Sequence, residues 1–127
     1  MILNKENYVE KAENVIKQLS QKDRNGKIKV ITTSQIRNLL AMSADIYNDV
    51  VISSEKLSLE LSSRIDYLRV RCVYEAGRDE TVKKFINNTE ILQILKEVRQ
   101  SRENYILFNH YMEALVAYHK FYNKYDK

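Results

Sequence analysis

The chain has 127 residues, of which 44% are hydrophobic and 30% charged, and this composition is typical of a globular protein and excludes extended disorder. Its length fits one domain, which we expect to span residues 1–127 as a single helical unit with a substantial core. The 21 Lys and Arg residues exceed the 17 Asp and Glu residues, so the net charge of +4 permits a polyanionic partner without requiring one.

Composition also excludes several classes of protein. Pro is absent and Gly occurs twice, which argues against a turn-rich β-sandwich or barrel. The single Cys excludes a disulfide within the chain and favours a reducing, cytoplasmic environment. No apolar run approaches the roughly 18 residues of a membrane span, and no apolar segment of a secretory signal is visible.

The first thirty residues predict a helix, a turn and an extended link. An apolar stripe at helical spacing predicts a helix from about residue 5 to 20, with Asn4 or Asn7 as its cap. Residues 21–27 are polar and carry Asn-Gly at the tip of a predicted turn. Residues 28–31 are β-prone, but the sequence offers no partner strand, so we expect them to be extended and to pack on helices.

The next two helices have recognisable boundaries. Thr32 with Gln35 three residues later fits a capping box, which predicts a helix that ends near Val51 or Ile52. Ser53 or Ser54 is expected to cap a third helix that runs to Ala76. Gly77 would then end that helix in a left-handed conformation.

The remaining third of the chain is also helical in pattern. Asp79 is expected to cap a short helix that residues 87–89 interrupt, and Thr89 is expected to begin the next one. A weak polar interruption at residues 101–104 precedes a last helix over about 104–123. The predicted fold class is therefore all-α, a compact bundle of five or six helices.

The third helix has the most informative surface. The helix has two apolar arcs on roughly opposite sides of its axis. This arrangement predicts a helix that is sandwiched between neighbouring helices. The second arc contains Leu59, Val70 and Val73. Between the arcs lies a strip that contains Glu60, Arg64, Tyr67, Arg71 and Tyr74. Arg78 continues this strip if the chain is not diverted at the glycine.

Two interpretations of this strip remain open. Arg side chains bind phosphates bidentately and Tyr rings stack on bases or sugars, so the strip suits nucleic acid. Alternatively, the Arg stems cover apolar surface and the Tyr rings pack between helices. A line of four tyrosines and one leucine on the last helix favours core or subunit contact in the same way. That line contains Tyr111, Leu115, Tyr118, Tyr122 and Tyr125.

No residue pattern supports catalysis, a metal or a cofactor, and we expect the protein not to be an enzyme. The chain has no Gly-rich phosphate loop. His110 and His119 are nine residues apart on one predicted helix, so they point to opposite sides and cannot ligate one metal together. We expect His119 to be a satisfied residue at the edge of the core and His110 to be a surface residue. Cys72 falls on the apolar stripe of the third helix and is expected to be a small buried hydrophobe.

Four segments in fixed order carry a resemblance to a known family. They are residues 6–13 (ENYVEKAE), 32–37 (TTSQIR), 67–78 (YLRVRCVYEAGR) and 111–118 (YMEALVAY). Together they resemble the small subunit of type III-A CRISPR effector complexes, the Csm complexes. One departure is His110, which stands where the family often has Arg before the last segment.

The resemblance implies an all-helical, non-catalytic protein of antiviral defence. Several copies of such a subunit stack inside a ribonucleoprotein, along the channel where guide RNA pairs with target RNA, and meet the backbone and large polymerase-like subunits. By position it implies RNA contact for Arg37, Arg69, Arg71 and Arg78. The surface interpretation adds Arg64 and Lys84 as weaker candidates. The alternative is a helical protein–protein interaction module that binds no nucleic acid.

Overall fold

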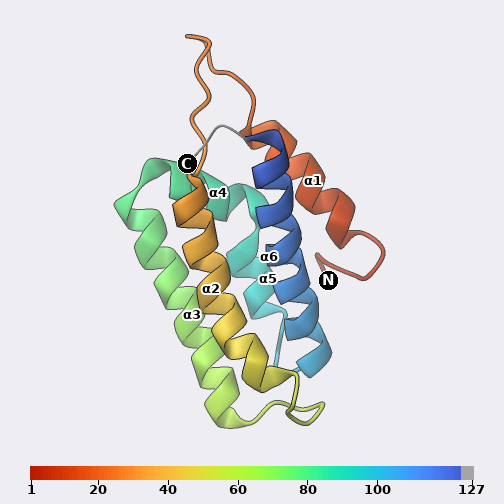
Figure 1. The fold of residues 1–127 in the computed structure, drawn as a ribbon. Helices are drawn as coiled ribbons and strands as arrows, with labels where there is room; N and C mark the ends of the chain where they lie inside the picture. Colours follow the sequence, from red (N-terminus) through yellow and green to blue (C-terminus); the bar gives the residue numbers. More distant parts are fainter. Residues whose placement is uncertain (124–127) are drawn as a thin grey trace.

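The computed structural model describes residues 1–123 and contains six helices in that range, as Figure 1 shows. They are α1 (Tyr8–Leu19), α2 (Thr33–Val50), α3 (Leu59–Arg78), α4 (Glu80–Thr89), α5 (Ile91–Lys96) and α6 (Arg102–Tyr122). Residues 1–123 form only two isolated β-bridges and no named strand. The all-α prediction is confirmed.

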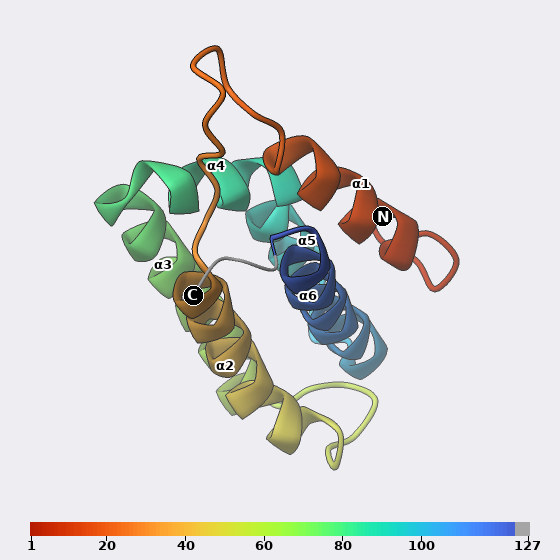
Figure 2. The same cartoon turned by 45° about the horizontal axis from the view of Figure 1, so that its top comes forward.

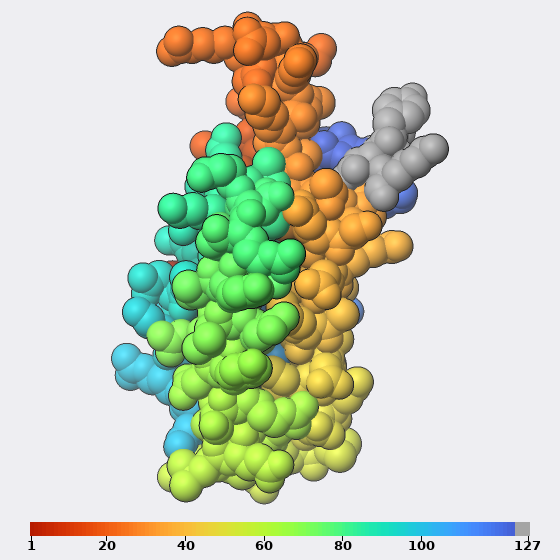
Figure 3. Space-filling model, turned by 90° about the vertical axis from the view of Figure 1, so that its left-hand side faces the viewer, coloured from red at the N-terminus to blue at the C-terminus, as the bar shows by residue number. Residues whose placement is uncertain are grey.

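The three long helices set the shape of the bundle. α2 and α3 lie side by side, α6 packs against α2, and α1 packs on the other side of α6 (Figures 1 and 2). The short helices α4 and α5 contact α3 (Figure 2). As a result, α3 contacts α2 along one flank and α4 and α5 along the other, and no helix of the described residues lies over its outer side (Figure 3).

The capping box predicted at the start of α2 is present. The Gln35 backbone N–H donates to Thr32 Oγ1 at 3.1 Å, and the Thr32 backbone N–H donates to Gln35 Oε1 at 2.9 Å. Two N–H groups that the helix leaves unpaired are thereby satisfied by side chains three residues apart. The helix ends at Val50, one to two residues before the end predicted near Val51 or Ile52.

The link between α1 and α2 also follows the prediction. Gly26 has φ +75°, which a glycine adopts without strain, and Asp23 Oδ1 accepts hydrogen bonds from the backbone N–H groups of Asn25 and Lys27. The extended residues after this turn reach back to the bundle, where Ile31 is completely buried. The turn itself projects from the end of the bundle (Figure 1).

Both predicted boundaries of α3 are wrong. Ser58, not Ser53 or Ser54, caps the helix and accepts from the Leu61 backbone N–H, while the Ser53 hydroxyl donates to the Val50 carbonyl. The helix also continues through Gly77 to Arg78. It ends because Asp79 takes an extended conformation (φ −150°, ψ 126°), in which its carboxylate caps α4.

The predicted break at residues 87–89 lies too early. Thr89 is buried, and its hydroxyl donates to the Phe85 carbonyl at 2.7 Å, so it belongs to the last turn of α4 and does not begin the next helix. The chain changes direction at Glu90, which has φ 60°. Ile91, directly after it, is fully buried and begins α5.

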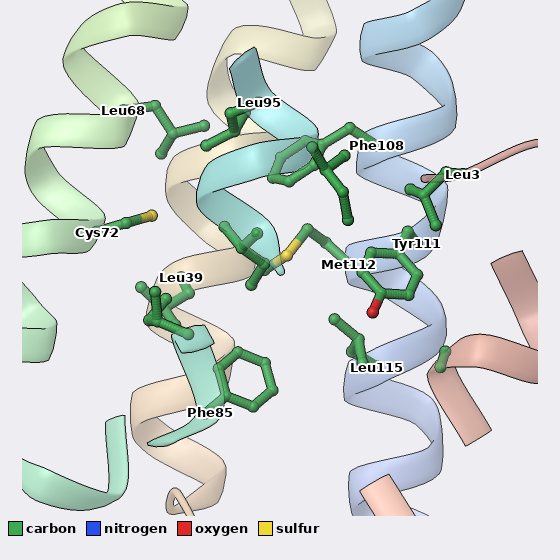
Figure 4. Packing of buried hydrophobic residues seen from close by; sticks show 14 of the residues in the cluster. Leu3, Leu39, Leu68, Cys72, Phe85, Leu95, Phe108, Tyr111, Met112 and Leu115 are labelled. Atoms are coloured by element: carbon green, nitrogen blue, oxygen red, sulfur yellow. The ribbon is translucent and has the colours of Figure 1, made fainter. Parts of the chain in front are cut away.

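One hydrophobic core joins the six helices. Its side chains come from helices far apart in the sequence, as Figure 4 shows for Phe85 of α4, Phe108 and Leu115 of α6, and Leu68 of α3. A buried polar network crosses it: the Tyr105 hydroxyl donates to the Ser43 carbonyl at 2.7 Å, and the Ser43 hydroxyl donates to Asn109 Oδ1 at 2.6 Å. Because these groups satisfy each other, the network fixes α2 against α6.

The last helix uses its aromatic line for packing. Tyr111 is buried and donates its hydroxyl to the Thr89 carbonyl, and the Tyr122 hydroxyl donates to Glu13 of α1 at 2.7 Å. Tyr125 lies outside the described residues. His119 is completely buried with Nε2 2.6 Å from the Ile31 carbonyl oxygen, which confirms it as a satisfied core residue. His110 lies between the rings of Tyr8 and Tyr47 and is half-buried, not a surface residue.

The Asp79 cap makes a testable contribution to acid stability. Two side-chain hydrogen bonds lower the pKa of Asp79 below its ordinary value of 3.8. The bond from the Thr81 hydroxyl has the larger effect and the bond from the Gln35 amide the next largest. Because the pKa is lower in the folded state, the charged carboxylate stabilises the fold at pH values above the ordinary pKa. This stabilisation is lost as the pH falls through the pKa of the folded state. Asp79→Asn keeps an acceptor at this position but removes the charge.

We therefore expect the denaturation midpoint of the wild type to exceed that of Asp79→Asn at neutral pH. The gap should narrow as the pH falls to 3.8 and below. Denaturant unfolding followed by far-UV circular dichroism over a pH series measures it. A gap that stayed constant down to the lowest pH would contradict this account.

Candidate nucleic-acid interface

Three of the predicted arginines share one strip of α3. Arg64, Arg71 and Arg78 are spaced seven residues apart, and seven residues make almost two full helical turns, so their side chains leave the helix on the same side. The strip persists to its last member because α3 runs straight through Gly77. It borders α2, as shown by a groove of about 570 Å³ whose lining includes Met42 of α2 and Arg64 and Arg71 of α3.

The charge of Arg64 is engaged within the chain. Its guanidinium lies 2.7 Å from Asp49 Oδ2 and 3.7 Å from Asp45 Oδ2, both on α2. The hydrogen bond to Asp49 raises the pKa of Arg64. With two carboxylates on one cation, Arg64 ties α3 to α2 and has little charge left for an external phosphate.

Arg71 and Arg78 are more available. Both approach Glu75, at 3.8 and 3.5 Å, so two cations share one carboxylate. Both guanidinium carbons also lie near the exposed Tyr74 ring, at 5.7 and 5.5 Å from its centre. The side chains are 43% and 62% exposed. Two Arg forks thus flank one solvent-facing aromatic ring, an arrangement that suits phosphate and base or sugar together.

The other predicted residues separate into two groups. Arg37 is exposed near the start of α2, and the Gln35 amide donates to Asp79 at 3.1 Å, so Arg37 lies at the same end of the bundle as Arg78. Lys84 is exposed on α4, where it shares a hollow with Lys29 and Lys83. These residues extend the positive charge beyond the end of α3.

Arg69 lies apart from this strip. In a helix, two positions correspond to a rotation of about 200°, so Arg69 faces away from Arg71. It pairs with Asp66 at 3.5 Å and lines hollows shared with α5. Lys96 and Arg99 line the same pocket as Arg69 but were not predicted as site residues. They come close to Arg69 only because α5 packs on α3.

The outer arc of α3 corrects the prediction of a sandwiched helix. Leu59 is 80% exposed, and Val70 and Val73 are more than half exposed. Val70 and Val73 line a hollow beside α5, but no helix among residues 1–123 lies over the outer side of α3 (Figure 3). An exposed apolar stripe of this kind offers a surface on which another molecule can pack.

Residues 1–123 contain no group of three or more His, Cys, Asp or Glu side chains placed to hold a metal ion. Within the same range, no helix is both long and apolar enough to cross a membrane.

The only cysteine is expected to be unreactive in the folded protein. Cys72 is 3% exposed, as its place on the apolar stripe predicted, and burial raises the pKa of its thiol to about 12. The reactive thiolate is therefore scarce at neutral and mildly alkaline pH. A chromogenic disulfide reagent should label the chain only after denaturant unfolds it. Rapid labelling of the native protein would contradict this placement.

The fold and its surface define a class of protein: an all-helical bundle whose distinctive chemistry lies on one exposed helix, in a strip of arginines beside an apolar arc. Comparison with known proteins identifies the family. A family model described as Csm2 Type III-A matches residues 4–125, and the chain belongs to this family.

Curated relatives agree over nearly the whole length. A protein of Streptococcus thermophilus named "CRISPR system Cms protein Csm2" is 47% identical over 125 residues, which is 98% of each chain. Proteins with the same name are 38% identical over the full length in Mycobacterium tuberculosis (strain CDC 1551 / Oshkosh) and 34% identical over 83% of this chain and 81% of the relative in Enterococcus italicus. The chain is thus a small subunit of a type III-A CRISPR Csm complex, and its partners include other Csm subunits.

Proposed function

We propose that the chain is a non-catalytic subunit that contacts RNA inside the type III-A effector complex, where several copies stack along the channel of paired guide and target RNA. Membership of the family supports the setting. The observation that carries the RNA contact is the pair of exposed guanidinium groups, Arg71 and Arg78, on either side of the exposed Tyr74 ring.

The contact is independent of RNA sequence. Arg71 and Arg78 neutralise backbone phosphates and release counterions, while base pairing between the two RNA strands supplies specificity. Glu75 holds the two guanidinium groups near Tyr74 before RNA arrives and reduces the loss of side-chain freedom on binding. The positive charge of Arg37 and Lys84 lies at the Arg78 end of this surface.

Weak contacts suffice because the subunit acts in several copies. A net charge of +4 supports only modest affinity for a polyanion in a single chain. Linked copies bind one RNA with a much higher effective concentration. The exposed Leu59, Val70 and Val73 supply an apolar surface for a neighbouring subunit in that arrangement.

A second function, a protein interaction module without nucleic acid, is favoured by the same apolar arc. Salt dependence separates the two functions. Affinity that depends on phosphate contacts falls steeply as salt rises, whereas an apolar interface responds little.

The direct test is recovery of the tagged full-length chain from its host, followed by sequencing of the bound RNA and identification of the bound proteins. We expect short RNAs that share a repeat-derived end, together with the other Csm subunits. Recovery of those subunits without such RNA would contradict the proposed function and leave the interaction module in its place.

A further inference from the structure

A second cationic site lies on the flank of α3 that faces away from Arg71 and Arg78. It is a pocket of about 230 Å³ between α3, α5 and the turn that leads into α6. Its polar lining includes Ser62, Arg69, Lys96 and Arg99. We propose that this pocket binds a phosphate group, either of an RNA backbone or of a free phosphate monoester.

The charge of the pocket is positive. Three cations line it against one carboxylate, that of Asp66, which pairs with Arg69 at 3.5 Å and is itself 74% exposed. Among residues 1–123, no carboxylate lies within ion-pair distance of Lys96 or Arg99, although Glu55 and Glu103 share a neighbouring hollow with Arg99. Cations from two helices and a turn that converge without matching carboxylates form a natural anion site.

The Ser62 hydroxyl provides an independent indication of a ligand. Its oxygen is buried and has no hydrogen-bond partner among the described residues, although Ser62 lines the pocket. A buried hydroxyl without a partner destabilises a fold and calls for an explanation. Because this oxygen is buried, the Ser62 side chain must rotate toward the pocket before a phosphate oxygen can accept its hydrogen bond.

The turn that places Arg99 is strained in the same region. Arg99 and Gln100 have backbone φ values of 47° and 64°, which residues other than glycine rarely adopt. The turn is held by hydrogen bonds from the Leu57 backbone N–H to the Gln100 carbonyl at 2.7 Å and from Ser101 to Val98 at 2.9 Å. Strain that the surrounding structure enforces is typical of functional sites.

This site goes beyond the arginine strip and does not depend on it. α3 separates the two, so a chain that used both would hold phosphate groups on opposite flanks of one helix. The outer arc of α3, with Val70 and Val73, lies between them.

The test uses the ¹⁵N-labelled full chain in a chloride buffer of constant ionic strength. Inorganic phosphate, adenosine monophosphate and a short single-stranded RNA without terminal phosphate are titrated in turn, and the signals of Ser62, Gln100 and the Arg Nε–H groups are followed. We expect saturable shifts at the pocket with inorganic phosphate. Shifts with the RNA as well assign the ligand to an RNA backbone, and shifts with phosphate and the monophosphate alone assign it to a free monoester.

Two variants and a matched control make the result specific. Lys96→Gln with Arg99→Gln should weaken phosphate binding by about tenfold or more, since two charge-assisted hydrogen bonds are lost. Lys22→Gln with Arg24→Gln removes the same charge from the exposed turn and should leave binding unchanged. Ser62→Ala should weaken phosphate binding without lowering the melting temperature, because it removes a hydroxyl that has no partner in the free protein.

Two outcomes would overturn the proposal. The first is the absence of any saturable shift at the pocket with inorganic phosphate. The second is an equal affinity for phosphate in the wild type and in the folded Lys96→Gln, Arg99→Gln variant.

Discussion

Complexes rebuilt with a small subunit that carries both Arg71→Gln and Arg78→Gln are expected to bind target RNA at least about tenfold more weakly than wild-type complexes. A hydrogen bond to a charged group is worth about 1.5–3 kcal/mol, and under the proposed function each copy of the variant would lose two such donors to RNA. Gln is preferred to Glu as the replacement because two further carboxylates beside Glu75 would destabilise the helix itself.

Binding to labelled target RNA over a series of salt concentrations measures this effect. The variant should show both a lower affinity and a shallower dependence on salt, because fewer counterions are released. Lys5→Gln with Lys120→Gln, two exposed lysines on other parts of the chain, is the control of equal charge. Equal affinity and equal salt dependence in the Arg71, Arg78 variant, with its far-UV spectrum intact, would remove these residues from the RNA surface.

The largest expected effect on stability comes from Phe85→Ala. Phe85 is completely buried and packs α4 against the other side chains of the core, as Figure 4 shows. Truncation of a buried Phe to Ala costs about 3–5 kcal/mol, through lost transfer free energy and the cavity left behind. That is a large share of the roughly 5–15 kcal/mol that stabilises an ordinary domain.

Denaturant unfolding of the isolated chain tests this prediction. Lys84→Ala, at the exposed position directly before Phe85, is the matched control and should change the free energy of unfolding by less than about 0.5 kcal/mol. Similar midpoints for the two variants would mean that α4 does not pack as described.

Local signals in the sequence predicted several elements accurately. The start of α2 depends on two side chains three residues apart, and the cap of α4 depends on Asp79 and the backbone N–H groups of Thr81 and Val82. The turn at Asn25 and Gly26 likewise depends on its own residues. Each of these contacts lies within four residues along the chain, so no knowledge of the remaining fold was required.

The boundaries that were predicted wrongly depend on partners elsewhere. Gly77 can end a helix, yet the cap that Asp79 makes on α4 sets the end of α3 at Arg78, two residues beyond the predicted Ala76. Residues 87–89 have low helix propensity, but burial of Thr89 and the Tyr111 hydroxyl on its carbonyl hold them in α4. Tertiary contacts outweigh propensities that differ by less than about 1 kcal/mol per residue.

The candidate sites likewise combine features that the sequence determines with features that depend on the tertiary structure. The sequence alone determined the all-helical class, the core stripe through Cys72 and the alignment of Arg64, Arg71 and Arg78, because each follows from the 3.6-residue period of one helix. Only the tertiary structure decided that α2 neutralises Arg64, that the outer arc of α3 is uncovered, and that Arg69 meets Lys96 and Arg99. Those facts depend on distances between elements, which no periodicity within a single helix encodes.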